Sequence, residues 1–525
     1  MPNLEPALTI PQMMAAAANH HGGSIAIDDD GLRISYRELD RQRQQAARAL
    51  LALEVGHGER VAIWAPNVHE WIVAALGLQS VGAVLVPLNT RMKGAEAGYI
   101  LRESGASLLF VIGEFLGTDY PALLVDEALP ALRQRICLRG TAEGCLDWEA
   151  FLALGQAVTP AQLASREAQV EADSLSDLLF TSGTTGKPKG VMSAHGQNLR
   201  IVRDWSAMVG LRPGDRYLIV NPFFHSFGYK AGWLAALMHG CCIFPQQVFD
   251  VPAMLERIAR ERVSVLPGPP TLYQSILGFP DRARYDLSSL RVAVTGAASV
   301  PVEMVRRMAR ELGFETIVTA YGLTEACGFV TICRPGDAPD VVATTSGRAF
   351  PDVEVRCVDA TGEPVPPGQP GEVTVRGYNL MKGYFNNPEA TREAIDAEGW
   401  LHTGDIGVLD EQGYLRITDR IKDMFITGGF NVYPAEIEQV ILRYPGVAQA
   451  AVIGIPDERL GEVAMAFLLP AGGQALDTDA FLAWCREHMA NYKVPRRAQV
   501  LSAMPLNAAG KITKDALRVM AKARA

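Results

Sequence analysis

A ten-residue run rich in glycine, lysine and hydroxyl side chains is the part of the sequence best suited to phosphate chemistry. Residues 181–190 read TSGTTGKPKG and hold three glycines, two lysines and four hydroxyl groups. Glycine lets backbone N–H groups approach phosphate oxygens closely, hydroxyls donate hydrogen bonds, and lysine offsets negative charge. The same composition also suits a solvated surface loop. The run therefore indicates a polyphosphate site only if other parts of the chain support it.

The spacing within this run argues against two common nucleotide-binding motifs. A Walker A loop places a hydroxyl residue directly after its lysine, whereas Pro188 follows Lys187 here. Proline offers neither a hydroxyl nor a backbone N–H, which disfavours a P-loop NTPase. The chain also lacks a G-x-G-x-x-G motif, which counts against a classical dinucleotide site.

Four further motifs follow the first one in order and at wide spacing. They are YGLTE (321–325), GWLHTGD (399–405), DRIKD (419–423) and NAAGK (507–511). Together the five motifs resemble the adenylate-forming superfamily of acyl-CoA synthetases, firefly luciferase and peptide-synthetase adenylation domains, over about residues 10–520. In that family a carboxylate attacks the α-phosphate of ATP, giving an acyl-adenylate and pyrophosphate. A thiol then attacks the acyl carbon and displaces AMP.

The resemblance assigns the phosphate and metal contacts to two of these motifs. The phosphate-binding run would be Thr181, Ser182, Gly183, Thr184, Thr185, Gly186 and Lys187. Glu325 would be a ligand of Mg²⁺, consistent with the preference of a hard cation for carboxylate oxygen. Thr324 would bind the α-phosphate. The alternative for Glu325 is a charge at a helix N-terminus, which the helix dipole favours by itself.

The resemblance assigns the nucleoside to residues from several predicted elements. They are Gly296, Ala297, Ala298, Tyr321, Gly322, Asp405 and Arg420. Small residues at 296–298 follow a predicted strand, and the carboxyl ends of strands are where open α/β sheets bind ligands. Asp405 would accept hydrogen bonds from both ribose hydroxyls, and Tyr321 would lie against the adenine. Core packing is the alternative for Tyr321, and a surface salt bridge is the alternative for Arg420.

Three elements near the C-terminus carry the roles that the family gives to a mobile domain. Lys511 would contact the carboxylate and the α-phosphate during adenylation, with Lys514 as a neighbouring alternative. Lys422 occupies the position of the hinge, where a few residues absorb a large change in φ and ψ. The turn Gly428-Gly429-Phe430 would let the pantetheine arm of CoA pass close to the backbone.

The acyl pocket is expected around the aromatic run NPFFHSFGYKAG. Its predicted residues are Phe224, His225, Tyr229 and Ala298. His225 would orient the carboxylate or gate the thiol, or it would be a satisfied core histidine. Amino-acid-activating relatives have an aspartate in this segment, and its absence here favours an uncharged acyl tail. Tyr229 and Lys230 would bind ketones of a ring-bearing acid, unless Lys230 reaches solvent.

Longer stretches, such as TAYGLTEA and ITDRIKDMFITGGFNVYPAE, resemble bacterial steroid-degradation ligases that activate an indane propanoate. A fatty acid–CoA ligase is the broader interpretation. Two other classes share the adenylation motifs: a luciferase-like oxidoreductase, and a stand-alone adenylation enzyme that loads a carrier protein. The substrates expected from the main interpretation are a small carboxylic acid, ATP with Mg²⁺, and CoA.

The elements that must position these residues alternate between strand and helix signals. Strand-like RVAIW and AVLVPL flank the helical EWIVAALGLQ, and a similar alternation returns after residue 215. Such alternation predicts an α/β fold with two helix-covered, parallel or mixed sheets. We place an N-terminal domain at 1–419 with a β-rich part at about 345–419. A hinge at 420–422 and a small α+β lid domain at 423–525 complete the predicted organisation.

Composition narrows the partners and the compartment. The 525 residues carry a formal charge of −9, which argues against a nucleic-acid partner. Eight cysteines without a C-x-x-C spacing favour buried reduced thiols over a disulfide framework or a zinc site. The apolar run 71–88 is better explained by a buried helix and strand than by a membrane span. We therefore expect a soluble cytoplasmic protein, for which a homodimer would be unsurprising.

Overall fold

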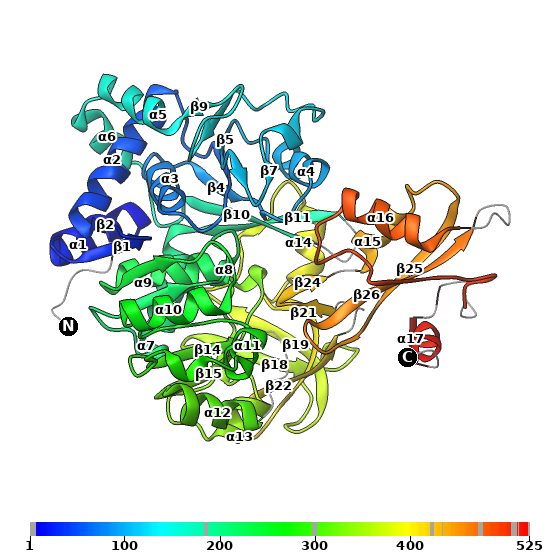
Figure 1. Ribbon diagram of the computed structural model, residues 1–525. Coiled ribbons are helices and arrows are strands. Elements are labelled where there is room, and N and C mark those ends of the chain that lie inside the picture. Colours follow the sequence, from blue (N-terminus) through cyan, green and yellow to red (C-terminus); the bar gives the residue numbers. More distant parts are fainter. Residues whose placement is uncertain are drawn as a thin grey trace.

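The chain folds into a large N-terminal domain built on three sheets and a smaller C-terminal domain (Figure 1). The computed structural model describes residues 7–182, 187–296, 302–420, 425–432, 434–470, 476–505, 512 and 514–522. This arrangement confirms the predicted fold class of helix-covered α/β sheets, a β unit and a small α+β domain.

One sheet of the large domain contains the hairpin that carries the first motif. Its eight strands run in the order β20-β11-β10-β4-β3-β5-β8-β9. They are β3 (Arg60–Trp64), β4 (Val84–Pro87), β5 (Leu108–Val111), β8 (Gln134–Cys137), β9 (Leu146–Asp147), β10 (Leu175–Ser182), β11 (Pro188–Ala194) and β20 (Gly383–Tyr384). β3, β4 and β5 pair in parallel and are almost wholly buried, which explains their continuous apolar sequences. β10 and β11 form an antiparallel pair on either side of the glycine run.

Helices pack around this sheet in the upper lobe of Figure 1. They are α2 (Tyr36–Ala52), α3 (His69–Ser80), α4 (Gly94–Ser104), α5 (Trp148–Leu154) and α6 (Pro160–Glu167), with short turns η1 (Ala122–Leu124) and η2 (Gly155–Ala157) and a ribbon of β6 (Glu114–Phe115) and β7 (Thr118–Asp119). Ser35 caps α2 by accepting from the backbone N–H of Glu38. The membrane-like run 71–88 is the buried helix α3 followed by buried β4, which confirms the prediction. No described helix is long and apolar enough to span a membrane.

The second sheet of the large domain supplies the other strand ends at the site. Two groups of four strands, β2-β1-β13-β12 and β14-β15-β16-β17, are joined through single bridges at Val265. The strands are β1 (Ile25–Asp29), β2 (Leu32–Ser35), β12 (Arg216–Ile219), β13 (Cys242–Pro245), β14 (Val292–Gly296), β15 (Thr316–Tyr321), β16 (Thr331–Ile332) and β17 (Arg348–Ala349). Around Val265 the strand pairing is limited to those bridges, because Pro267 has no N–H to donate to a ladder.

The helices of this second layer include one irregular turn. They are α1 (Ile10–His21), α7 (His195–Val209), α8 (Ser226–Gly228), η3 (Tyr229–Leu234), α9 (Ala235–Met238), α10 (Val251–Glu261), α11 (Pro270–Gly278), η4 (Arg282–Arg284), α12 (Val302–Leu312), η5 (Thr324–Ala326) and α13 (Pro339–Thr344). The segment GWLAALMHG begins within the π-helix η3, in which Gly232 departs from helical φ and ψ. π-Helical turns are rare and occur often at functional sites.

The remaining strands form the predicted β unit and the small domain. The β unit has the order β18-β19-β21-β22, with β18 (Val353–Val358), β19 (Pro370–Gly377), β21 (Leu401–Leu409), β22 (Leu415–Arg420) and helix α14 (Pro388–Ala394). The small domain comprises β23 (Phe425–Thr427), β24 (Phe430–Val432), β25 (Val447–Asp457), β26 (Gly461–Pro470), β27 (Arg497–Val500), α15 (Pro434–Ile441), α16 (Thr478–His488) and α17 (Lys514–Lys522).

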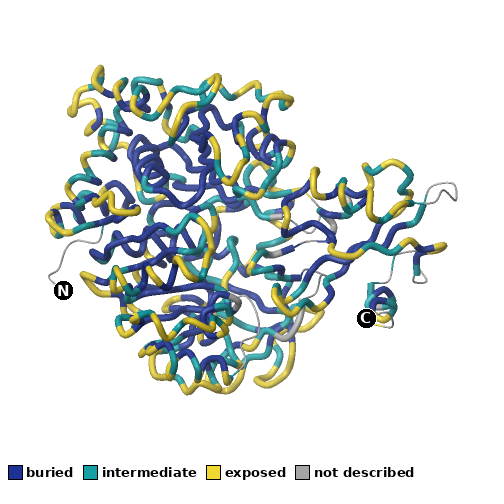
Figure 2. The backbone as a smooth tube through the Cα atoms, in the orientation of Figure 1, coloured by how far each residue is buried: buried dark blue, intermediate teal, exposed yellow. Residues whose placement is uncertain are grey.

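The two domains have separate hydrophobic cores (Figure 2). One cluster of buried side chains extends from Ile10 to Leu415, and two smaller clusters lie between Phe425 and Ala521. The predicted hinge at 420–422 stays a prediction, because residues 421–424 lie outside the described residues. All eight cysteines are unpaired, and seven of them are buried, as the sequence predicted.

Candidate active site

Glu325 lies where three segments of the large domain meet. It belongs to the short turn η5, which follows β15. Thr181 Oγ1, at the end of β10, donates to Glu325 Oε1 over 3.3 Å, and Tyr384 Oη, on β20, donates to the same oxygen over 3.0 Å. The backbone N–H of Met381 also donates to the Glu325 carbonyl. The structure thus brings together Thr181 and Glu325, which are 144 residues apart in the sequence.

The electrostatic surroundings of Glu325 suit a carboxylate that binds a cation. Burial raises the pKa of Glu325 above its ordinary value, whereas hydrogen bonds from Tyr384 and Thr181 and the charge of Lys189 oppose that rise. The Lys189 ammonium lies 5.1 Å from the centre of the Tyr384 ring. A carboxylate has further lone pairs for a metal ion after it accepts two hydrogen bonds. Glu325 could therefore hold a hard cation next to the predicted phosphate motif.

A second pair of predicted residues meets between the second sheet and the β unit. Tyr321 Oη, at the end of β15, donates to Asp405 Oδ2, on β21, over 2.6 Å. Asp405 is buried and stands opposite Arg420 in the register of β21 and β22. Asp405 and Tyr321 could together present a carboxylate and a flat ring to a nucleoside.

Two glycines at the same end of the second sheet allow the backbone to approach closely. Gly296 ends β14 beside Ala320, and a Cβ atom at residue 296 would lie 2.4 Å from the Ala320 carbonyl oxygen. At Gly322 a Cβ atom would lie 2.0 Å from the carbonyl oxygen of Gly328. Any side chain at either residue would push apart the strand ends that position Tyr321 and Glu325.

The aromatic run next to the site is only partly accessible. His225 is exposed, and its Nδ1 accepts from the backbone N–H of Phe227 at the start of α8. Nδ1 carries no proton while it accepts this hydrogen bond, so the ring is neutral in this arrangement. Phe224 is half-buried. Tyr229 is fully buried, stacks on Trp233, and its hydroxyl contacts Gln79 Nε2 over 2.7 Å. The hydroxyl of Tyr229 is thus engaged within the core.

Lys230 does not reach solvent, in contrast to one of the two sequence-based alternatives. Its side chain has no exposed area, and its Nζ lies 3.2 Å from Oδ1 of the equally buried Asp177, on β10. Lys230 also donates to Ser193 Oγ, on β11, over 3.1 Å. Asp177 Oδ2 accepts from the side chains of Ser176 and Asn198. Lys230 therefore connects η3 to β10 through a buried ion pair and to β11 through a hydrogen bond. We call β10 and β11, the two strands on either side of the glycine run, the phosphate hairpin.

The glycine turn of the small domain faces the large domain. Gly428 and Gly429 have φ values of 55° and 84°, and they connect β23 and β24 as a two-residue hairpin turn. Positive φ at both positions is typical of a type I′ turn. A Cβ atom at Gly429 would lie 3.3 Å from Pro269 Cβ, at the start of α11. A larger residue at 429 would therefore press against the large domain.

Several predicted residues lie outside the described residues or side chains. They are Gly183, Thr184, Thr185, Gly186, Ala297, Ala298, Lys422 and Lys511, together with the side chains of Ser182 and Arg420. Among the other phosphate residues, Lys187 is exposed, and Thr324 is half-buried at the start of η5. All these assignments stay predictions.

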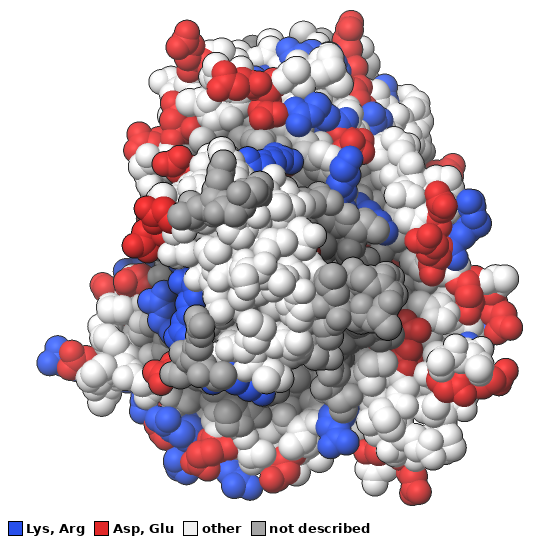
Figure 3. All heavy atoms as spheres, turned by 90° about the vertical axis from the view of Figure 1, so that its right-hand side faces the viewer, with Lys and Arg blue, Asp and Glu red and all other residues white. Residues whose placement is uncertain are grey.

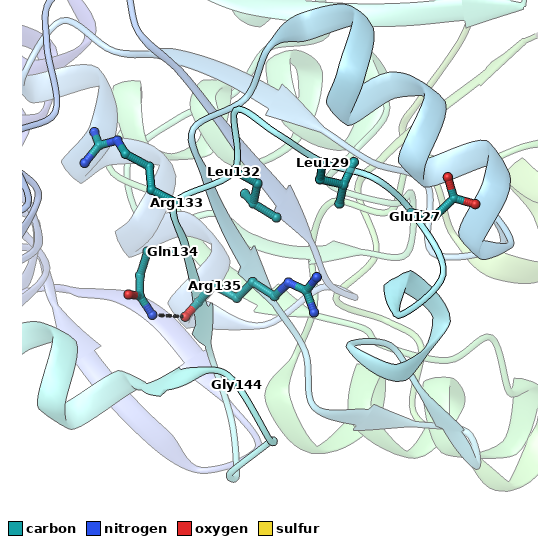
Figure 4. Close-up of a pocket in the computed structure, with 7 residues that line it drawn as sticks. All are labelled: Glu127, Leu129, Leu132, Arg133, Gln134, Arg135 and Gly144. Carbon is teal, nitrogen blue, oxygen red and sulfur yellow. Dashed lines mark hydrogen bonds between the residues drawn. The ribbon is translucent and has the colours of Figure 1, made fainter.

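Two other features of the large domain are separate from this site. A surface hollow of about 350 Å³ lies near β8, and none of the residues that line it belongs to a motif (Figure 4). Asp29, His69 and Glu70 cluster at the edge of the second sheet, where the Arg139 guanidinium contacts both carboxylates. This cluster is an ion-pair network, because Arg139 already supplies the positive charge.

Comparison with protein families gives a match along most of the chain. Residues 14–385 match the family model described as "AMP-binding enzyme", and residues 436–511 match "AMP-binding enzyme C-terminal domain". This chain belongs to that family. Within it, the chain is an AMP-forming acid–thiol ligase of the acyl-CoA synthetase type.

Two curated relatives have the same printed name, "3-[(3aS,4S,7aS)-7a-methyl-1,5-dioxo-octahydro-1H-inden-4-yl]propanoyl:CoA ligase". The protein of Rhodococcus jostii is 48% identical over 516 residues, covering 97% of this chain and 98% of the relative. The protein of Mycobacterium tuberculosis is 50% identical over 510 residues, with 97% and 98% coverage. These relatives support the resemblance drawn from the motifs, and they do not favour the luciferase-like or carrier-loading alternatives.

Two solved structures of Bacillus subtilis o-succinylbenzoate CoA synthetase differ in their similarity to this chain. A double mutant bound to the product analogue OSB-NCoA gives a TM-score of 0.81 at 28% identity, covering 97% of this chain and 98% of that chain. The complex with the acyl-adenylate OSB-AMP gives a TM-score of 0.65 at 28% identity, with 96% and 97% coverage. The present arrangement is thus more similar to the complex with the CoA product analogue.

The sequence analysis did not single out two residues that the structure places near Glu325 and the glycine run, Tyr384 and Asp177. Tyr384 contacts Glu325, and Lys230 pairs with Asp177 beneath the hairpin. The sequence around Tyr384 carries no local signal for this contact, because Glu325 is 59 residues away on another element. The Asp177 pairing had no local signal, because its partner is 53 residues away on another element.

Proposed function

We propose that this ligase activates a ring-bearing propanoate of the dioxo-indane type and transfers the acyl group to CoA. Two relatives of about half identical sequence, each matched over nearly the whole chain, support this substrate class. The acyl segment also supports it, because residues 221–232 contain no acid that would pair with an amino group. The observation that carries the reaction type is the meeting of Thr181, Tyr384 and Glu325 at the edge of the phosphate hairpin.

In the first step, a carboxylate oxygen of the substrate attacks the α-phosphorus of ATP. A P–O bond forms, and the bond to the pyrophosphate oxygen breaks, so that pyrophosphate leaves with the electron pair. We assign Glu325 as the Mg²⁺ ligand and the run 181–187 as the binding loop of the β- and γ-phosphates. Lys511 would neutralise charge at the α-phosphate, because positive charge there stabilises the developing transition state. Removal of Mg²⁺ by a chelator should stop this step.

In the second step, the CoA thiolate attacks the acyl carbon of the adenylate. A C–S bond forms, the C–O bond to the phosphate breaks, and AMP leaves with the electron pair. We assign the turn Gly428-Gly429-Phe430 as the wall along which the pantetheine arm passes. Neutral His225 would orient the carboxylate or the acyl carbonyl. The eight unpaired cysteines suit a reducing compartment, so we place the enzyme in the cytoplasm.

The deciding experiment measures pyrophosphate and AMP release with a panel of acids. The panel contains the dioxo-indane propanoate, hexanoate, octanoate, palmitate, ferulate and alanine, each with and without CoA. We expect CoA-dependent AMP release, with the highest kcat/KM for the ring-bearing acid. A preference for the linear fatty acids would refute the substrate class. Absence of AMP formation with every acid would refute the reaction itself.

Lys511→Ala tests the assigned role of the C-terminal lysine by separating the two half-reactions. We expect loss of adenylate formation, measured as pyrophosphate exchange, with thioester formation from supplied acyl-AMP largely retained. Lys514→Ala is the matched control, because Lys514 pairs with Glu438 within the small domain. Equal loss of both half-reactions in Lys511→Ala would contradict the assignment.

A further inference from the structure

A buried ion cluster joins the small domain to helix α4 of the large domain. The Lys493 ammonium, which precedes β27, lies 2.9 Å from Glu96 Oε1, and Lys493 also contacts Glu436, on α15. Only 5% of the Lys493 side chain and 14% of the Glu96 side chain are exposed. Burial alone would lower the pKa of Lys493, but Glu436 and Glu96 outweigh burial and raise it well above its ordinary value. The ammonium is therefore charged, and it links two carboxylates from different domains.

Two neighbouring contacts join the same surfaces. Asn89 Nδ2 donates to Tyr492 Oη over 3.3 Å, and the Arg91 guanidinium lies 4.4 Å from the centre of the Phe430 ring. Phe430 and Tyr492 stack with 4.6 Å between ring centres. Residues 89–96 thus contact both the segment before β27 and the glycine turn of the small domain. Figure 1 shows α15 and α16 on the side of the small domain that faces the upper lobe.

The docked surface includes the turn that we assign to the pantetheine arm. Phe430 ends that turn, and Gly429 lies against Pro269. The chain also has the higher TM-score, 0.81 against 0.65, with the solved relative that holds a CoA product analogue. Both observations associate the Glu96–Lys493 contact with the arrangement of the thioester step.

We propose that Glu96 is a positioning residue for the second half-reaction: its contact with Lys493 holds the small domain where the glycine turn can guide CoA. This inference rests on the proposed function, because it requires an enzyme with an adenylation step and a thioester step. Glu96 touches neither substrate nor reacting atoms. The contact of Glu96 with Lys493 raises the fraction of molecules in the docked arrangement. A ligand that binds only that arrangement then binds with higher apparent affinity.

Lys493 and Glu96 each keep a polar partner within their own domain if the contact between them breaks. When the domains separate, Lys493 keeps Glu436 within its own domain. Glu96 keeps the backbone N–H of Lys93, which donates to Glu96 Oε2 over 2.9 Å at the start of α4. Neither charge would be left buried without a partner, which is the costly outcome for an ion pair. Within this ion cluster, separation of the domains therefore replaces only the Lys493–Glu96 contact with water.

The test is Glu96→Gln, assayed in each half-reaction with the full-length enzyme. Glutamine keeps an oxygen that can accept from Lys93, so the start of α4 and the folding of the domain are preserved. We expect AMP release from supplied acyl-AMP and CoA to slow by about tenfold, within the usual range of coupling between sites. Pyrophosphate exchange without CoA should stay within about twofold of the wild type.

Two further variants make the result decisive. Glu103→Gln, an exposed position on the same helix, should change neither half-reaction. Asn89→Ala removes the contact to Tyr492 and should slow the thioester step alone, by less than Glu96→Gln. Equal slowing of both steps, or an unchanged thioester step in Glu96→Gln, would overturn the inference. Failure of the wild type to form AMP with any acid would instead refute the proposed function.

Discussion

The buried pair of Lys230 and Asp177 gives the most quantitative prediction. At 3.2 Å, two unit charges attract by about 5 kcal/mol if the effective dielectric constant is about 20. Desolvation of both groups offsets much of this attraction, so the pair as a whole contributes little net stability. Loss of one partner is different, because the other charge stays buried. We therefore expect Lys230→Met to lower the free energy of unfolding of the large domain by about 3–5 kcal/mol.

The double variant Lys230→Met/Asp177→Asn should recover most of that loss, since no unpaired charge remains in the core. Asparagine can still accept from Ser176 at residue 177. The assay is urea unfolding followed by tryptophan fluorescence, because Trp233 stacks on Tyr229 next to Lys230, and Trp71 packs 6.0 Å from Trp233.

The matched control is the exposed pair formed by Lys382 and Asp173. Its atoms are 2.7 Å apart, and 38% and 84% of the two side chains are exposed. Lys382→Met should cost less than about 1 kcal/mol, because solvent screens exposed charges. The reasoning would be refuted if Lys230→Met cost no more than this control. It would also be refuted if the double variant were less stable than the single variant.

Three further predictions concern the site and the fold. Tyr384→Phe removes one hydrogen bond from Glu325 and should raise the Mg²⁺ concentration for half-maximal pyrophosphate exchange several-fold. An unchanged Mg²⁺ concentration would show that Tyr384 does not support the metal site. Gly429→Leu should slow the thioester step far more than pyrophosphate release, because the added side chain meets Pro269. Equal impairment of both steps would contradict the role that we assign to the glycine turn. His69 and Arg139 lower the pKa of Asp29 from 3.8 to about 2 despite its burial. The ionised carboxylate of Asp29 therefore stabilises the fold fully above pH 3.8. This contribution is lost as pH falls through 2. Asp29→Asn should therefore cost about 2 kcal/mol at pH 7 in urea unfolding and progressively less below pH 4; a cost independent of pH would contradict this.

The sequence predicted the architecture well where a local pattern determines an element. The apolar runs of β3 and β4 are buried parallel strands, and the helix expected between them is α3. The roles of Thr181 and Glu325 came from the family resemblance, and the structure brings the two side chains into contact, each at or just after the carboxyl end of a strand.

Contacts set by tertiary packing could not be read from the sequence. η3 is a π-helix in place of a regular helix, and Lys230 within it is buried against Asp177. No pattern near Lys230 encodes a partner on β10. The Glu96–Lys493 contact is equally hidden, because it depends on how two independently folded domains dock. Positive and negative side chains are interspersed on the face in Figure 3. Because no charge of one sign dominates there, the distribution of charged residues does not point to the Glu96–Lys493 contact.

The separation of the hydrophobic cores has a consequence for how such enzymes diversify. Because the described parts of the two domains share no apolar core, a substitution that repacks the large domain places no packing demand on the small domain. The interior of each domain can therefore change in evolution without a matching change in the other. The residues that must stay matched are those that meet between the domains, such as Glu96 with Lys493 and Arg91 with Phe430.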